Sequence, residues 1–277
     1  MKKFISIAAA IVCLVILTNA CKEKKYKDYQ QTESGLLYKF EVENKDARSP
    51  KPDDFLYLSL SYRTDNDSIV FEEREINDIM RPSVYSADLY EAYGLMHEGD
   101  VATFVLKADS FFVNMMGIQD LPAFILPETM MEFHIKLNKI KSLPEFEQEE
   151  TQMITKYVND NNIQVQPLES GLYFIETQAG TGAKVDTGKT IKINYTGKLL
   201  DGTVFDSSLG EGREPMEFVL QDGMMIKGFT EGLLLMKDKG KATLLMPSKI
   251  AYGPGHPQSP IPPYSPLLFE VEILEVK

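Results

Sequence analysis

The sequence predicts an α+β protein built from two copies of one antiparallel unit. The tetrapeptide Glu-Ser-Gly-Leu at residues 33–36 recurs at residues 169–172, and both copies lead into an apolar run rich in tyrosine. Further matches keep their order along the chain: Leu95-Met96 with Leu235-Met236, Ala102-Thr103 with Ala242-Thr243, and Phe133 with Phe269. A repeat this long indicates two domains, because solenoid units are far shorter. Each domain is expected to bury one face of a twisted antiparallel sheet under a single short helix.

The repeat and the segments around it divide the chain into five parts. We expect a signal peptide at 1–20, a tether at 21–32, a first domain at 33–143, a helical linker at 144–168 and a second domain at 169–277. The tether is polar and rich in lysine, which predicts a solvated segment. The linker helix is predicted from an apolar stripe with acidic residues in its first turns. Its stripe consists of Phe146, Met153, Ile154, Tyr157 and Val158.

The N-terminus has the pattern of an export signal. A basic start, Met1-Lys2-Lys3, precedes an apolar run at 4–17 that is short for a membrane-spanning helix. Ala20-Cys21 resembles a bacterial lipoprotein cleavage site, although Thr18 stands where leucine is usual. We therefore expect Cys21 to be lipidated, with ordinary signal cleavage as the alternative. Lipidation predicts a membrane-anchored protein of the bacterial cell envelope, at the outer membrane and facing the periplasm or the cell surface.

Composition excludes several classes of function. The net charge of -12 and the pI of about 4.8 argue against a nucleic-acid partner, which requires clustered lysine and arginine. Both cysteines, Cys13 and Cys21, lie in the first 21 residues, so the folded part has no disulfide framework or cysteine zinc site. The three histidines are spaced too widely for a local metal motif. Neither G-x-S-x-G nor H-E-x-x-H occurs, which argues against hydrolysis.

The second copy shows a strand-rich order with one helix. Strands are expected at 172–177, 191–196, 204–207, 215–220, 241–246 and 267–274, and a helix at 224–236. Asp201-Gly202 predicts a two-residue hairpin turn between the second and third of these strands. A loop with six prolines precedes the last strand.

Three motifs in this order resemble the FKBP-type peptidyl-prolyl cis-trans isomerases: NYTGKLLDGTVFDSS from residue 194, MMIKGFTEGLLLM from residue 224, and AYGPGHP followed by IPP and LLFEVEIL from residue 251. The resemblance covers about 169–277. It implies a bent sheet half-wrapped around a helix, rotation about Xaa-Pro amides, proline-containing polypeptide clients and no cofactor or metal. The matching repeat extends the FKBP-like fold to the first domain.

The resemblance also assigns a site. Phe229 would be its floor, Asp206 its edge, and the Tyr252 hydroxyl and the Ile226 N–H its hydrogen-bond donors. The walls would be Tyr195, Phe205, Met216, Met225, Ile226 and Phe269, with Ile261 leaning over the mouth. The family's usual floor is tryptophan, so Phe229 is expected to weaken macrolide binding. Met216 replaces a usual phenylalanine. Taken singly, these aromatics would be core residues, Asp206 a turn cap and Tyr252 a loop anchor.

The resemblance and the predicted export signal lead to two alternative functions. The first is an isomerase that assists folding of exported envelope proteins; the alternative is a non-enzymatic chaperone or assembly lipoprotein using both folds as binding modules. When the two copies of the repeat are aligned, Tyr62 matches Tyr195, Leu89 takes the place of Phe229, and Phe112 replaces Tyr252. The first domain is thus expected to lack turnover and to bind extended chain or act as a spacer.

Overall fold

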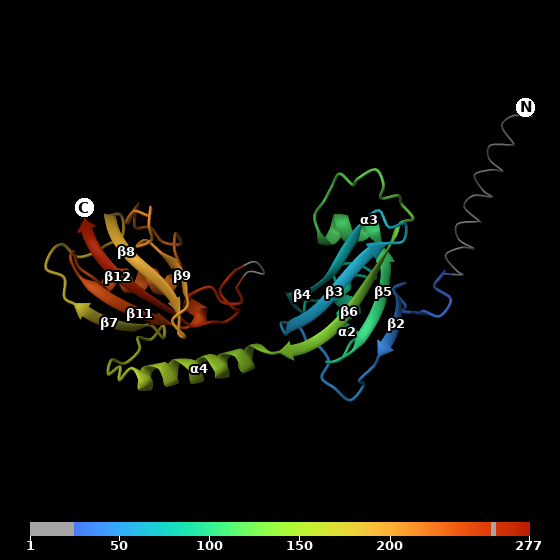
Figure 1. The fold of residues 1–277 in the computed structure, drawn as a ribbon, viewed down its shortest axis with the longest axis horizontal. Coiled ribbons are helices and arrows are strands. Elements are labelled where there is room, and N and C mark those ends of the chain that lie inside the picture. Colours follow the sequence, from blue (N-terminus) through green and yellow to red (C-terminus); the bar gives the residue numbers. More distant parts are fainter. Residues whose placement is uncertain (1–24, 256–258) are drawn as a thin grey trace, which may run out of the picture. The chain divides into compact units, whose positions relative to one another are not determined.

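The computed structural model describes residues 25–255 and 259–277, and it divides after Ser142 into two compact units (Figure 1). The predicted signal peptide, the lipidation site Cys21 and His256 lie outside the described residues. No helix in the described ranges is both long and apolar enough to cross a membrane. The same ranges hold no cluster of three or more potential metal ligands.

The C-terminal unit is an antiparallel sheet with one helix packed on it. Its sheet runs in the order β10-β8-β12-β11-β7, and β9 pairs with β8. The elements are α4 (Leu143–Asp160), β7 (Tyr173–Gln178), β8 (Thr190–Leu199), β9 (Val204–Ser207), β10 (Met216–Val219), α5 (Lys227–Leu235), β11 (Lys241–Met246), the 3-10 turn η2 (Ser248–Ile250) and β12 (Leu267–Val276). The turn predicted at Asp201-Gly202 is part of a four-residue connection between β8 and β9.

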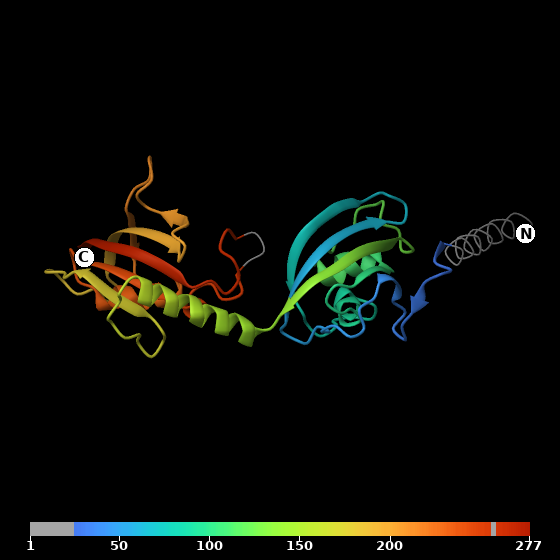
Figure 2. The same ribbon diagram turned by 60° about the horizontal axis from the view of Figure 1, so that its bottom comes forward.

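The N-terminal unit repeats this arrangement. Its sheet runs β1-β2-β5-β6-β3-β4, so that β2, β5, β6 and β3 take the places of β7, β11, β12 and β8. The elements are β1 (Gln30–Gln31), β2 (Leu37–Val42), β3 (Phe55–Thr64), β4 (Val70–Ile79), α2 (Leu89–Gly94), β5 (Val101–Lys107), α3 (Ala108–Ser110), the π-helical turn η1 (Phe111–Met115) and β6 (Met130–Lys141). The sheet bends over its helical segments (Figure 2). The predicted α+β fold with two domains of one antiparallel arrangement is confirmed.

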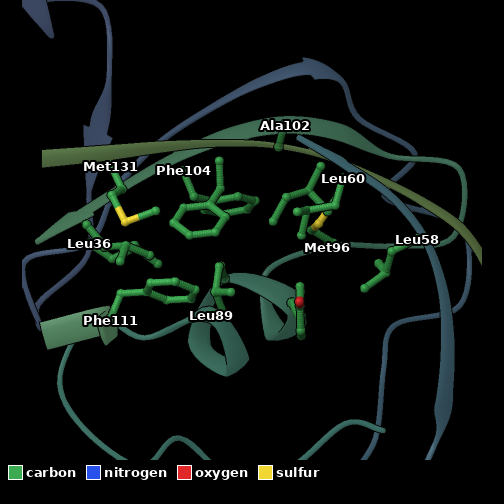
Figure 3. Packing of buried hydrophobic residues seen from close by; sticks show 14 of the residues in the cluster. Leu36, Leu58, Leu60, Leu89, Met96, Ala102, Phe104, Phe111 and Met131 are labelled. Carbon is green, nitrogen blue, oxygen red and sulfur yellow. The ribbon is translucent and has the colours of Figure 1, made fainter. Parts of the chain in front are cut away.

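The core of the N-terminal unit lies between this sheet and α2. Leu58 and Leu60 from β3, Phe104 from β5 and Leu89 from α2 belong to this core, and all four side chains are buried (Figure 3). Phe111 enters the same core from η1. Its ring centroid lies 6.0 Å from that of Tyr62 and 5.1 Å from that of Phe133.

The segment predicted to be a solvated tether is partly folded. Tyr26 is only 8% exposed, and its hydroxyl donates a 2.9 Å hydrogen bond to Glu132. Gln30 and Gln31 form β1, which pairs with β2. The expectation of solvation is wrong for Tyr26, whose ring packs on the domain. Gln30 and Gln31 are exposed as expected, although their backbone pairs with β2.

The helix predicted in the linker forms, and four of the five residues of its predicted stripe are buried or half-buried. Phe146 is buried, and Ile154, Tyr157 and Val158 are half-buried, whereas Met153 is 47% exposed and Glu150, which lies outside the stripe, is buried. The stripe was predicted from apolar residues alone, so it could not include a buried carboxylate such as Glu150. α4 belongs to the C-terminal unit and lies alongside its sheet (Figure 1).

A close approach between α5 and β11 depends on Gly232. A Cβ at this position would lie 2.6 Å from Cδ2 of the fully buried Leu244. We expect Gly232→Ala to destabilise the C-terminal unit by about 1–3 kcal/mol, because overpacking outweighs the better helix propensity of alanine. Chemical denaturation would measure the loss, with the exposed Leu235→Ala as a control on the same helix. An unchanged or higher midpoint for Gly232→Ala would contradict the expected clash.

Candidate active site

A cavity of about 540 Å³ opens in the C-terminal unit. Ten residues line it: Tyr195, Phe205, Asp206, Met216, Met224, Met225, Ile226, Phe229, Tyr252 and Phe269. They come from four strands, from the segment just before α5 and the first turn of that helix, and from the loop after η2. The structure thus brings together residues that are up to 74 positions apart in the sequence, and most of them are apolar.

Nine of the ten residues assigned to the site from the sequence line this cavity. Ile261 does not: its side chain is 7% exposed and belongs to the buried core. The expectation that it leans over the mouth is corrected, because an aliphatic side chain gains more by packing inside than by covering an open edge. The sequence reasoning missed Met224, which lines the cavity and is 55% exposed. The only feature of the sequence that could have indicated Met224 as a lining residue was its position next to Met225.

Aromatic rings form the floor and one wall. Phe229 is 4% exposed, and its ring centroid lies 5.0 Å from that of Phe269 and 6.2 Å from that of Tyr195. Phe205 meets Phe269 at 5.6 Å, also edge-to-face. Gly197 leaves room for these rings, because a Cβ there would lie 2.6 Å from the Phe205 ring. Edge-to-face packing fixes each ring in one orientation and gives the cavity a defined shape.

Asp206 anchors a polar network at the edge of the cavity. Its Oδ2 accepts a 2.5 Å hydrogen bond from the Tyr195 hydroxyl, and its Oδ1 accepts 2.7 Å and 2.9 Å bonds from Arg213 Nη1 and the Ser207 N–H. Arg213 also donates to the Ser207 carbonyl oxygen at 2.7 Å. Sequence reasoning missed Arg213, since nothing in the seven-residue spacing marks it as a partner.

This network sets the ionisation of both partners. The hydrogen bond from the Tyr195 hydroxyl, together with Arg213 and the Ser207 N–H, holds the pKa of Asp206 below its usual range. Burial and the neighbouring Asp206 carboxylate raise the pKa of Tyr195 to about 12. At neutral pH the edge therefore carries a carboxylate and a phenol that keeps its proton, and the ring of Tyr195 is held in place against the cavity.

Removing the Arg213 side chain should shift the titration of Asp206. We expect Arg213→Ala to raise the Asp206 pKa toward the usual range, because the carboxylate loses the one charged donor among its three hydrogen-bond donors. A carboxyl with a lowered folded-state pKa stabilises the fold above its unfolded pKa, and the contribution is lost as pH falls through the folded value. Arg213→Ala should therefore lose part of its stability at pH values above the usual aspartate range and little at strongly acidic pH.

Carbon-13 NMR of the Asp206 carboxyl carbon would follow this titration directly. Arg213→Lys is the matched control, because it keeps the positive charge and loses the planar guanidinium. We expect its midpoint to fall between those of wild type and Arg213→Ala. A midpoint that is identical in all three chains would show that Arg213 does not stabilise the carboxylate.

Two hydrogen-bond donors of the cavity are available to a ligand. The N–H of Ile226 has no acceptor among the described residues, because Ile226 has extended backbone just before α5 and its carbonyl alone joins the helix. Tyr252 lines the cavity and is 48% exposed. Burial of the hydroxyl and the nearby Asp206 raise the Tyr252 pKa, so the hydroxyl stays protonated.

The corresponding region of the N-terminal unit is filled by its own side chains. Phe111 packs on Tyr62 and Phe133, and Phe112 is also buried, at 9% exposure. Phe71 stacks on Tyr62 at 4.8 Å. Glu72 lines a different and more polar cavity of about 390 Å³, which includes Arg63, Glu132 and His134 among its walls. In the segment 111–116, Met116 is exposed, whereas Phe111 and Phe112 are buried.

Comparison with known proteins agrees with the C-terminal site. Residues 182–274 match the family described as FKBP-type peptidyl-prolyl cis-trans isomerase. The FK506-binding protein of Neisseria meningitidis serogroup B is 44% identical over 106 residues, which are 38% of this chain and 96% of that protein. A 22 kDa FKBP-type peptidyl-prolyl cis-trans isomerase of Escherichia coli is 43% identical over 123 residues, which are 44% of this chain and 58% of that protein.

A further relative is a protein of Legionella longbeachae that is named outer membrane protein MIP. It is 41% identical over 110 residues, which are 40% of this chain and 46% of that protein. The chain thus spans about half the length of several curated relatives, and nearly all of the short Neisseria protein.

Proposed function

The chain belongs to the family of FKBP-type peptidyl-prolyl cis-trans isomerases, and we propose that its C-terminal unit catalyses rotation about Xaa-Pro amides in polypeptide clients. The observation that carries the proposal is the cavity itself, in which an aromatic floor, apolar walls and two available donors converge. No covalent step is needed for this reaction, and none of the lining residues has to act as a nucleophile.

The energetics of the amide explain what such a cavity can do. The planar amide is stabilised by resonance, and rotation crosses a barrier of about 18–20 kcal/mol. At the twisted geometry the resonance and much of the amide dipole are lost. An apolar cavity therefore disfavours the polar planar forms more than the twisted form, and differential binding of this kind accelerates the reaction.

Individual residues have separate tasks in this proposal. The proline ring would lie on Phe229, which is buried and held by Phe269 and Tyr195. The Ile226 N–H and the Tyr252 hydroxyl would donate to carbonyl oxygens of the substrate and fix its orientation. Asp206 would keep Tyr195 in place and present a negative charge beside the reacting carbonyl.

A proline-isomerisation assay tests this function. We expect a chain that begins at residue 22 to accelerate isomerisation of short peptides with an apolar residue before proline. The absence of any rate above the spontaneous one, for every Xaa-Pro peptide in a panel, would rule out the enzyme. Because Phe229 replaces the usual tryptophan, macrolides should bind this chain weakly, which calorimetry would measure in the same sample.

We also propose that the protein is anchored in the bacterial cell envelope through lipidation of Cys21. The basic start, the apolar run and Ala20-Cys21 support this, and so does the name of the Legionella relative. The finer placement is the outer membrane, facing the periplasm or the cell surface, where exported polypeptides would be the clients. Mass spectrometry of the purified N-terminus would show the lipid, and Cys21→Ala should release the protein from membranes.

For the N-terminal unit we propose a role without turnover. In the alignment of the two copies, Leu89 replaces the aromatic floor and Phe112 replaces the hydroxyl donor. Phe111 also packs against Tyr62 and Phe133. Such a unit would serve as a spacer or would bind extended chain at its surface. Saturable binding of unfolded polypeptide by a chain of residues 33–143 would favour the second role, and no binding would favour the spacer.

A further inference from the structure

A buried carboxylate joins the helix α4 to the rest of the C-terminal unit. Glu150 is 8% exposed although it carries a charge, and its partner Ser248 is 3% exposed. Glu150 Oε1 accepts a hydrogen bond from the Ser248 N–H at 2.5 Å, and Oε2 accepts one from the Ser248 hydroxyl at 3.2 Å. Burial raises the pKa of Glu150 against the effect of these bonds. A carboxylate is kept in such a place only when its oxygens are satisfied.

Ser248 in turn holds the backbone on both sides of Tyr252. It begins η2, and its carbonyl oxygen accepts hydrogen bonds from the N–H groups of Ala251 and Gly253, both at 2.9 Å. The residue between these two donors is Tyr252, whose side chain lines the cavity. A displacement of Ser248 therefore moves the backbone that carries the Tyr252 ring.

A second contact from the same face of α4 reaches the far side of this loop. The Phe146 ring lies 4.3 Å from the ring of Tyr264, centroid to centroid. The Tyr264 N–H donates a 2.7 Å hydrogen bond to the Gly253 carbonyl oxygen. Phe146 and Glu150 are four residues apart, so both project from one side of the helix. α4 thus contacts the two segments that converge on Gly253.

We propose that Glu150 is a positioning residue for the isomerase reaction, acting through Ser248 to hold the Tyr252 hydroxyl at the cavity. This rests on the proposed function, and it makes α4 part of the catalytic unit rather than a passive connection. Tyr252 is 48% exposed and sits in a loop with left-handed backbone at Gly253 and Gly255. Because the side chain is half-exposed, its position depends on the backbone of the loop that carries it.

The test is a double-mutant cycle between Glu150 and Tyr252. We expect Glu150→Ala to lower kcat/KM by about tenfold, as small displacements of an orienting group do, whereas Glu150→Gln should recover most of the rate because its amide oxygen still accepts from Ser248. In a Tyr252→Phe chain, Glu150→Ala should have little further effect, since the hydroxyl that it positions is already gone. Glu147→Ala, which removes an exposed carboxylate from the same helix, is the matched control.

Amide hydrogen exchange gives a readout that does not depend on turnover. Glu150→Ala should speed exchange at Ala251 and Gly253, and Glu147→Ala should not. An equal loss of rate in the wild-type and Tyr252→Phe backgrounds, or a wild-type rate in Glu150→Ala, would overturn the proposal. If Glu150→Ala fails to fold, the same cycle with Glu150→Gln applies, with a smaller expected coupling. A wild-type chain without isomerase activity would refute the proposed function instead, and the exchange rates would still decide whether Glu150 holds the loop.

Discussion

Phe229→Ala should abolish most of the isomerase activity and destabilise the C-terminal unit by about 3–5 kcal/mol. The ring is 4% exposed and contacts both Phe269 and Tyr195, so its removal leaves a hole beneath the cavity and frees two neighbouring rings. The free energy of unfolding would be measured by chemical denaturation, and kcat/KM by the isomerisation assay at a temperature where the variant is folded.

Two further variants at this position separate shape from stability. Phe229→Leu keeps much of the buried volume but not the flat ring, so we expect a smaller loss of stability and a large loss of activity. Phe229→Trp restores the ring usual in the family and should strengthen macrolide binding if the surrounding side chains make room. A Phe229→Ala chain that keeps the wild-type rate while folded would show that the proline ring does not lie on this residue.

The double substitution Asp206→Ala with Tyr252→Phe should lower kcat/KM by about 10- to 100-fold. It removes one hydroxyl donor and the charged anchor of Tyr195, and each lost hydrogen bond is worth about 0.5–3 kcal/mol, depending on charge. The fold should persist, because both side chains lie at the edge of the cavity, with exposed fractions of 43% and 48%. The isomerisation assay and circular dichroism would measure the two effects.

This variant also separates the two functions that the sequence leaves open. An isomerase should lose turnover and keep binding to unfolded polypeptide, whereas a chaperone without turnover has no rate to lose. Asp201→Ala is a suitable control: it removes an acid from the same hairpin, at a position outside the cavity lining. A double variant as active as wild type would show that neither side chain takes part in the reaction.

Much of the architecture could be predicted because it depends on local patterns. β11 begins and ends where alternation placed it, and the closing strand was two residues longer than expected. The predicted helix at 224–236 begins only at Lys227. Met224 to Ile226 are apolar enough to continue a helical pattern, but in the structure they line the cavity instead. Periodicity alone does not distinguish a helix face from the wall of a site.

The candidate site was predictable to the extent that ordered motifs carry it. Arg213 and Glu150 were missed for a common reason: their roles arise from contacts formed only in the folded chain. Glu150 and Ser248 are 98 residues apart, and no pattern along the chain links them. The resemblance placed Ile261 over the mouth of the cavity, whereas its side chain is buried in the core.

The burial of Tyr26 changes how far the folded part can reach from a lipid at Cys21. A freely solvated segment from residue 21 to residue 33 would allow about 40 Å of travel, at the reach of an extended chain. Because Tyr26 is held by Glu132, the distance between Cys21 and this contact is at most about 17 Å, the extended length of five residues. An anchored protein would thus keep its N-terminal unit close to the lipid headgroups. Tyr26→Ala should lengthen this limit to about 30 Å, because β1 at Gln30 is then the next contact with the domain, and fluorescence energy transfer to labelled lipid would detect the change.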